Sequence, residues 1–171
     1  MSLLFPYTSY TITTHISEVE AFKRIGKQVR ITKGFWDLWL RWSNEMLPYK
    51  GKITGNTFKI IRNIKYNNPG LPVITGKIEQ QDGKTYIHIR MRPEWFVILF
   101  NIIILSIIGA VAILFNIEWF KDARHSLQTL DKGPIYGFMF AYLIVIVPFH
   151  IEASISRKFF ANLFKDASVA Q

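Results

Sequence analysis

The chain contains no cysteine among its 171 residues. This absence excludes disulfide bonds, thiol nucleophiles, iron–sulfur clusters and thiolate zinc sites. Acidic residues are also scarce: 12 Asp and Glu stand against 21 Lys and Arg, which gives a formal net charge of +9. In a soluble protein this excess would indicate a nucleic-acid partner. Half of the residues are hydrophobic, however, and two uncharged blocks in the second half of the chain favour a different interpretation.

Recognisable catalytic motifs are missing as well. The chain has no GxSxG, Walker, HExxH or GxGxxG pattern. Its four histidines do not have the spacing of a metal site; they are His15, His88, His125 and His150. The sequence therefore predicts a protein that is not an enzyme and that uses no cofactor or metal.

The two uncharged blocks predict membrane-spanning helices. Residues 95–117 form a 23-residue run without a charge, and about 20 helical residues cross a hydrocarbon core. Residues 133–151 form the second block, in which Pro134 suits a first helical turn. Pro148 is expected to kink this helix or to mark its exit from the bilayer. We expect a transmembrane hairpin over residues 94–151, with His150 and Glu152 near the membrane edge.

The distribution of basic residues predicts the orientation of the hairpin. With two spans both chain ends lie on one side, and that side holds 18 of the 21 Lys and Arg residues. Arg90, Arg92, Arg157 and Lys158 stand next to the spans. The positive-inside rule therefore places both termini in the cytoplasm. The positive charge then needs no nucleic acid to explain it.

The residue pattern of 1–93 is typical of a small folded unit. Apolar and polar residues alternate between residues 50 and 92, which predicts an antiparallel meander of four strands. Asp82-Gly83 is typical of a tight hairpin turn, and Gly76 indicates a bulge or a close packing point. Upstream, residues 10–14 are strand-like, and Ser17 and Glu20 form a capping box for a helix reaching about Lys27.

The aromatic-rich stretch 35–47 is either a further strand or a helix on the membrane surface. We therefore predict an α+β cytoplasmic head over residues 1–93, in which an antiparallel meander or small barrel packs with a helix. Only Pro93 and Glu94 separate this head from the first span, so we expect the two to move together. The pattern of residues 152–171 predicts an amphipathic tail helix, with Arg157 and Lys158 at the headgroup level. This helix is expected either to lie on the inner leaflet or to pack against the head.

Two sets of residues are candidates for binding. Tyr86, His88, Arg90 and Arg92 share one strand face beside the bilayer and are suited to an anionic headgroup or nucleotide. The alternative is a solvated basic face. Small residues recur at four-residue spacing in the spans and permit close helix contact; they are Ser106, Ala110, Gly133, Gly137 and Ala141. They either pack the two spans together or form a subunit contact in an oligomer.

The stretch 51–100 resembles a family of small two-span bacterial membrane proteins. That family has a strand with an Arg, then Tyr-x-Asn-Ser-Phe-Leu-Pro, then a Gly-Thr strand ending in Met-Arg before a span. The matching positions here are Arg62, Tyr66, Asn68, Leu71, Pro72, Gly76, Met91 and Arg92, and Pro69-Gly70 replaces the Ser-Phe pair. The resemblance implies an architecture in the bacterial inner membrane, and it implies no activity.

These observations favour a non-enzymatic membrane protein whose head binds a protein partner or an anionic ligand. We expect the lipid bilayer and either a second copy or other subunits of a membrane complex as partners. The alternative hypothesis is a membrane-disrupting defence effector with a sensing β domain and oligomerising spans. It draws on a looser similarity to anti-phage effectors that join two spans to a small β-barrel in the opposite chain order.

Overall fold

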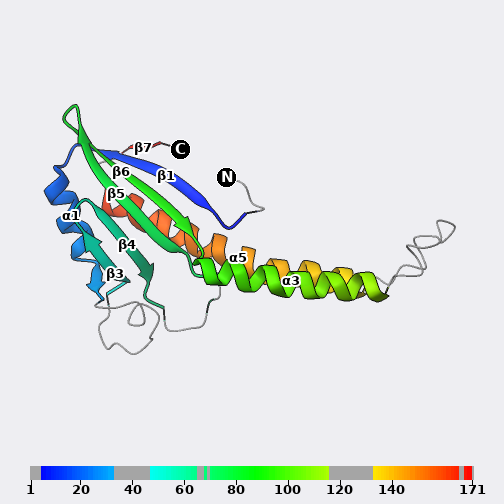
Figure 1. The fold of residues 1–171 in the computed structure, drawn as a ribbon. Helices are drawn as coiled ribbons and strands as arrows, with labels where there is room; N and C mark the ends of the chain where they lie inside the picture. The colour runs from blue at the N-terminus through cyan, green and yellow to red at the C-terminus, as the bar shows by residue number, and fades with distance from the viewer. Residues whose placement is uncertain are drawn as a thin grey trace.

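The computed structural model describes residues 5–32, 47–64, 68, 70–115, 133–165 and 168–170. It is an α+β structure, as predicted, from which two long helices project (Figure 1). The elements in chain order are β1 (Thr8–Thr14), α1 (Glu18–Gly26), β2 (Val29–Ile31), β3 (Tyr49–Thr54), β4 (Thr57–Arg62), β5 (Val73–Gln81), β6 (Lys84–Arg92), α3 (Trp95–Phe115), α5 (Gly133–Leu163) and β7 (Ser168–Ala170). The predictions for most of the stretch 35–47, for the loop between the spans and for Tyr66 lie outside the described residues.

The strands form one sheet in the order β2-β3-β4-β5-β6-β1-β7. Strands β3 to β6 form the predicted antiparallel meander, and β1 pairs antiparallel with β6 along its whole length. The short strand β2, which the sequence analysis did not predict, pairs in parallel with β3. Among the described strands β2 and β7 form the two edges, so the structure is an open sheet and not a barrel.

Local sequence signals explain where several elements begin and turn. The Ser17 hydroxyl accepts a hydrogen bond from the backbone N–H of Glu20 at 3.2 Å, which confirms the N-terminal cap of α1. Asp82 and Gly83 both have positive φ angles, 50° and 72°, and join β5 to β6 in the predicted tight turn. A methyl group at Gly76 would collide with the Phe58 ring, so this glycine is a close packing point.

The hydrophobic core lies between one face of the sheet and the last part of α5. Residues from β1, α1, β3, β4, β5 and β6 contribute to it, among them Ile12, Ile25, Ile60, Ile78, Ile87 and Met91. Helix α5 adds Phe149, Ala153 and Phe160, and Phe164 follows the end of the helix; each of the four is no more than 1% exposed. The core therefore extends beyond the predicted unit 1–93, because α5 supplies the large side chains that cover the sheet.

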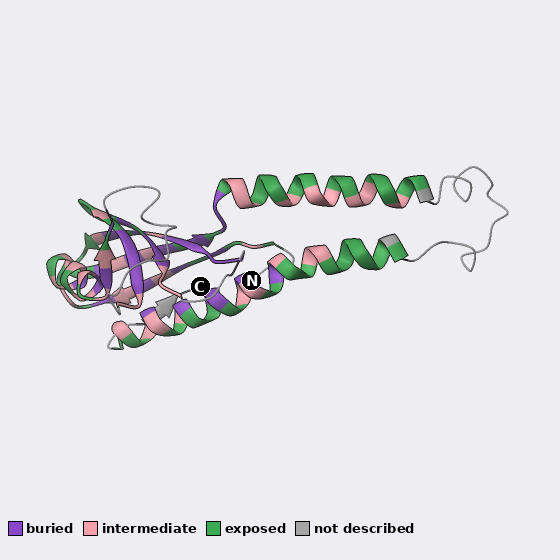
Figure 2. Ribbon diagram, turned by 90° about the horizontal axis from the view of Figure 1, so that it is seen from below, coloured by how far each residue is buried: buried purple, intermediate pink, exposed green. Residues whose placement is uncertain are grey.

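Helix α5 runs without interruption for 31 residues and has Pro148 inside it. The predicted tail helix is therefore the continuation of the second apolar helix. It ends at Leu163, and the next element along the chain is the short strand β7. A proline removes one backbone hydrogen bond and need not end a helix whose neighbours are well packed. The tail was predicted to lie either on the inner leaflet or against the head. In the structure it packs against the sheet (Figure 2). We call the sheet, α1 and the α5 residues from Phe149 onward the sheet domain.

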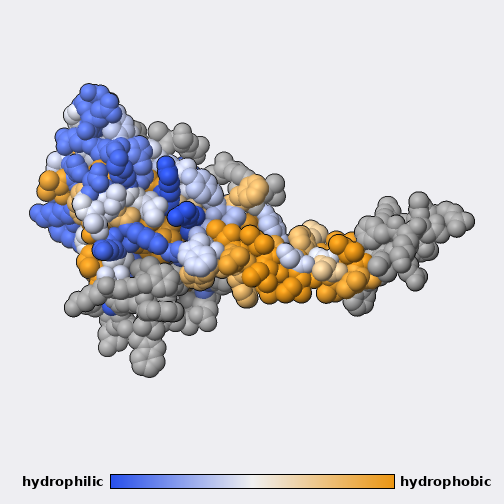
Figure 3. All heavy atoms as spheres, in the orientation of Figure 1, coloured by the Kyte–Doolittle hydropathy of each residue, from blue (hydrophilic) through white to orange (hydrophobic). Residues whose placement is uncertain are grey.

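Within the described ranges, two helices are long and apolar enough to cross a membrane, judged by length and composition. The apolar window of α3 has no buried residues, and that of α5 is 22% buried because the helix continues under the sheet. In the space-filling view the hydrophobic helices project from a largely hydrophilic sheet domain (Figure 3). The start of α3 and the middle of α5 thus mark a change from polar to apolar surface.

Candidate functional site

The four residues predicted to bind a ligand lie on the face of the sheet turned away from α5, which we call the outer face. Tyr86, His88, Arg90 and Arg92 alternate along β6 with buried residues of the core. Tyr86 and His88 are half-buried, whereas Arg90 and Arg92 are exposed. The alternation of a half-buried strand therefore places all four side chains on one surface.

His88 takes part in a network that spans three strands. Its Nδ1 lies 2.9 Å from the Thr11 hydroxyl on β1, and its Nε2 lies 3.4 Å from a carboxylate oxygen of Glu79 on β5. Glu79 also forms an ion pair with Lys77. The hydrogen bond from Lys77 is the main reason why the pKa of Glu79 is lowered. Both ring nitrogens of His88 thus have protein partners, and the network joins β1, β6 and β5.

Arg90 and Arg92 differ from His88 in their surroundings. Within the described part of the chain, neither guanidinium has an acidic group at ion-pair distance. Arg90 lies between Ser9 of β1 and Thr75 of β5 in the register of the sheet. Arg92 is the last residue of β6, three positions before α3 begins. This end of the outer face therefore presents two guanidinium groups, which are well suited to bind phosphate or carboxylate oxygens.

Strand β4 binds the start of α3 through its outer face. The Lys59 ammonium group lies 2.5 Å from a carboxylate oxygen of Glu94, whose side chain is only 8% exposed. The carbonyl of Glu94 accepts hydrogen bonds from the backbone N–H groups of Val97 and Ile98 at 3.0 and 3.2 Å. A carboxylate at a helix N-terminus also interacts favourably with the helix dipole. Glu94 thus both begins α3 and attaches it to the sheet.

The opposite face of β4 binds α5 through a second ion pair. Arg62 donates a hydrogen bond of 2.5 Å to one carboxylate oxygen of Glu152, and the Asn68 side-chain amide donates to the other at 3.3 Å. The Glu152 side chain is 1% exposed, and Arg62 is 28% exposed. A charge removed from water in this way needs partners of this kind to be tolerated. One strand therefore holds both long helices, one on each of its faces.

The loop before β5 contacts α5 beside Pro148. A Cβ atom at Gly70 would lie 2.8 Å from the backbone nitrogen of Phe149 and 2.8 Å from the carbonyl oxygen of Val145. Only a glycine fits such an approach of two backbones. The side-chain oxygen of Asn68 accepts a hydrogen bond from the Gly70 N–H at 2.9 Å, which fixes the loop in this position. The loop therefore contacts α5 at Val145 and Phe149, and Arg62 contacts the same helix at Glu152.

Two tyrosines lie under the sheet against α5. Burial raises the pKa of Tyr49, against a smaller opposing effect of the neighbouring Ser156 hydroxyl. Burial likewise raises the pKa of Tyr10. The Tyr49 ring lies 4.7 Å from that of Phe159, between ring centroids. The Arg157 guanidinium stands over the Tyr10 ring at 5.4 Å, so this predicted membrane-surface residue contacts the sheet domain, while Lys158 is exposed.

The small residues predicted to form helix contacts do not lie between α3 and α5, with one exception. Ser106, Ala110, Gly133 and Gly137 are exposed, and only Ala141 is half-buried. A Cβ atom at Gly137 would meet nothing within 4 Å. The half-buried residues of α3 follow a helical stripe that consists of Phe96, Val97, Asn101, Ile104, Leu105, Ile108, Gly109 and Ala112. Mostly larger side chains therefore fill the space between the helices.

The sequence analysis did not predict the ion pair between Glu152 and Arg62 or the one between Glu94 and Lys59. A signal was present, because an isolated acidic residue at the end of an apolar helix must find a partner when it is buried. The partner itself was not readable from spacing, since Arg62 and Glu152 are 90 positions apart. The sequence analysis named Asn68 and Arg62 only as positions that match the family motif.

Comparison of the chain with models of protein families, with curated proteins and with solved structures finds no match. The resemblance of residues 51–100 to two-span bacterial membrane proteins thus stays a prediction. Among the described residues, no group of three or more His, Asp or Glu side chains could hold a metal ion. The function must therefore be argued from the site itself.

Proposed function

We propose that this chain is a non-enzymatic protein of the bacterial inner membrane whose sheet domain binds an anionic ligand or another subunit of a membrane complex. In this proposal α3 and the first half of α5 cross the bilayer as a hairpin, and the sheet domain lies in the cytoplasm with both termini. The observation that carries the proposal is the pair of exposed guanidinium groups of Arg90 and Arg92 at the end of β6.

The attachment of the sheet domain to the helices supports a membrane-anchored binding role. Lys59 with Glu94 and Arg62 with Glu152 fix the start of α3 and the middle of α5 to the same strand. The outer face is consequently held at a constant height and tilt relative to the apolar helices. A ligand or partner at the membrane surface would then meet a preorganised surface, which lowers the entropic cost of binding.

The experiment is native mass spectrometry of the protein extracted gently from the membranes of its own host. We expect either a second protein in fixed ratio or a bound anionic mass. The charge reversal Arg90→Glu plus Arg92→Glu should reduce the bound fraction about tenfold, since charge-assisted hydrogen bonds are lost. Lys23→Glu plus Lys27→Glu is the matched control, because it changes the net charge equally at exposed residues away from the outer face. Equal binding by wild type and the arginine variant would overturn the proposal.

A second candidate function is supported by the exposed small residues of α5. Gly133 and Gly137 are exposed, and no described residue lies within 4 Å of a Cβ atom placed at Gly137; such surfaces permit close contact between membrane helices. An oligomerising, membrane-disrupting effector would use this surface for contact between copies. Its overexpression should depolarise cells, and Gly137→Leu should abolish the effect. Absence of depolarisation under strong induction would rule this candidate out.

A further inference from the structure

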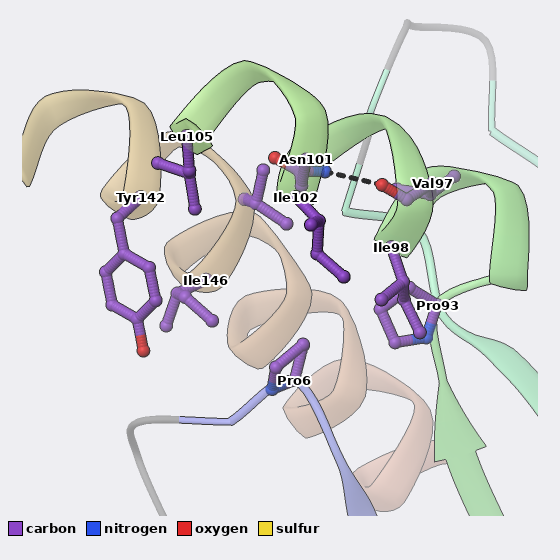
Figure 4. A pocket seen from close by; sticks show the side chains of 10 residues that line it. Pro6, Pro93, Val97, Ile98, Asn101, Ile102, Leu105, Tyr142 and Ile146 are labelled. Carbon is purple, nitrogen blue, oxygen red and sulfur yellow. Dashed lines mark hydrogen bonds between the residues drawn. The ribbon is translucent and has the colours of Figure 1, made fainter. Parts of the chain in front are cut away.

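Among the described residues, a cavity lies between the two apolar helices, next to the sheet domain. It has a volume of about 190 Å³ and is formed by α3, α5 and two prolines, one shortly before β1 and one directly after β6. Its lining consists of Pro6, Pro93, Val97, Ile98, Asn101, Ile102, Leu105, Tyr142, Val145 and Ile146. In the close view Pro93 and Ile98 lie at one end of this pocket, and Leu105 and Tyr142 at the other (Figure 4).

The pocket offers nothing to a polar ligand. Its surface is formed by apolar atoms. Pro6 and Pro93, the two lining residues outside the helices, have no backbone N–H to donate. The side-chain amide of Asn101 donates to the Val97 carbonyl at 2.8 Å and so is engaged within α3 (Figure 4). The occupant that fits this lining is a hydrocarbon chain.

The position and opening of the pocket match a lipid tail in the leaflet nearest the sheet domain. Ile98 and Ile102 are 40% and 55% exposed, so the pocket opens sideways toward the surroundings of the helices. From Val97 to Leu105 the helix rises about 12 Å. One leaflet contributes about 15 Å of hydrocarbon. A chain lying along α3 would therefore occupy most of the depth of that leaflet.

The residues next to Pro6 and Pro93 are those expected at a lipid headgroup. Phe5 and Tyr7, which flank Pro6, are exposed, and so is Trp95, two positions after Pro93. Tyrosine and tryptophan concentrate at the interface between membrane and water. Arg92 precedes Pro93 directly, is exposed, and has no acidic partner among the residues described. Its charge complements the phosphate of a lipid whose tail enters the pocket.

We propose that this pocket holds one acyl chain of a phospholipid, with the phosphate of that lipid beside Arg92. The inference rests on the proposed function in so far as both require the helices to lie in a bilayer. It adds a lipid-binding site that neither the helix lengths nor the outer face implies. The bound lipid would fill the space between α3 and α5 where the two helices meet the sheet domain.

The test is native mass spectrometry of the full chain released from nanodiscs of a single phospholipid. Wild type should retain one lipid under activation that removes loosely attached lipids. Ile102→Trp, which fills the pocket, should lower the lipid-bound fraction about tenfold. Ile103→Trp is the matched control, because Ile103 is similarly exposed on α3 and does not line the pocket. Leu105→Trp provides a second pocket-filling variant should the first fail to fold, and Arg92→Gln should weaken retention as well.

Each outcome of this test bears on the inference. Lipid loss in the pocket variants but not in Ile103→Trp supports it. Equal retention by all variants, a wild type without tightly held lipid, or a dimer that covers the pocket in place of lipid overturns it. An alkaline wash of the membranes separates this inference from the proposed function. If the protein washes off, the membrane anchor itself is refuted, whereas retention without a held lipid refutes the lipid site alone.

Discussion

At the scale of single residues, the two buried carboxylates determine how this molecule is held together. Glu94 and Glu152 are 8% and 1% exposed, and each has a basic partner on β4. An ion pair at the surface contributes little, because water already solvates both groups. A buried carboxylate that loses its partner is costly, because its charge stays behind without compensation. Removing one partner of either pair should therefore destabilise the protein more than the intact pair stabilises it.

Replacing Arg62 with methionine should destabilise the protein by about 3 kcal/mol, because the Glu152 carboxylate then stays buried without its strongest donor. The double variant Arg62→Met plus Glu152→Leu should recover most of this loss. Unfolding by denaturant in detergent micelles measures both. Lys77→Met is the control, since its pair with Glu79 is exposed and its loss should change the stability far less. Similar losses for Arg62→Met and Lys77→Met would contradict the burial argument.

The same Lys77→Met variant tests the network around His88. The pKa of Glu79 is lowered chiefly by Lys77, so the carboxylate stays ionised to a lower pH than usual. Its interactions are therefore present above the ordinary carboxyl pKa and are lost as the pH falls through the lowered value. Removing Lys77 should raise the pKa of Glu79 toward its ordinary value, as measured by carbon NMR titration of the side-chain carboxyl. An unchanged pKa would show that Lys77 does not control this group.

At the scale of secondary-structure elements, the parts of the fold that depend on local signals were predictable. The alternation in β5 and β6, the Asp82-Gly83 turn and the Ser17 cap act over a few residues and appear in the structure as expected. The parallel strand β2 was not predictable, because three residues carry no clear period. The continuity of α5 was also missed, since a proline and a change of composition at residue 148 indicate an end that tertiary packing overrides.

The most direct consequence of that continuity is that α5 supplies part of the core. Phe160→Ala should destabilise the sheet domain by about 3–5 kcal/mol, because it leaves a cavity among Tyr49, Phe58 and Phe159. Ile155→Ala on the same helix is the control, since Ile155 is 38% exposed and should cost less than about 1 kcal/mol. Thermal unfolding followed by near-ultraviolet circular dichroism distinguishes them. Equal midpoints for the two variants would mean that α5 does not complete the core.

At the scale of the whole molecule, contacts on both faces of β4 join the sheet domain to the two apolar helices. The chain leaves the sheet through α3 and returns to it through α5, and β4 holds both helices (Figures 1 and 2). Of the candidate site, the shared face of Tyr86, His88, Arg90 and Arg92 followed from strand periodicity. The engagement of His88 by Thr11 and Glu79 did not, because cross-strand neighbours depend on a register that one sequence does not reveal.

In the proposed membrane arrangement, α5 passes directly from the bilayer into the sheet domain, so that the sheet and the end of α5 lie on one side of the membrane and the loop between the helices on the other. Since the chain has no cysteine, single substitutions can report this without background. Labelling intact cells with a membrane-impermeant maleimide should modify Arg124→Cys, whereas Lys84→Cys and Asn162→Cys should react only after permeabilisation. Protection of all three positions, or labelling of Lys84→Cys and Asn162→Cys from opposite sides, would contradict the account.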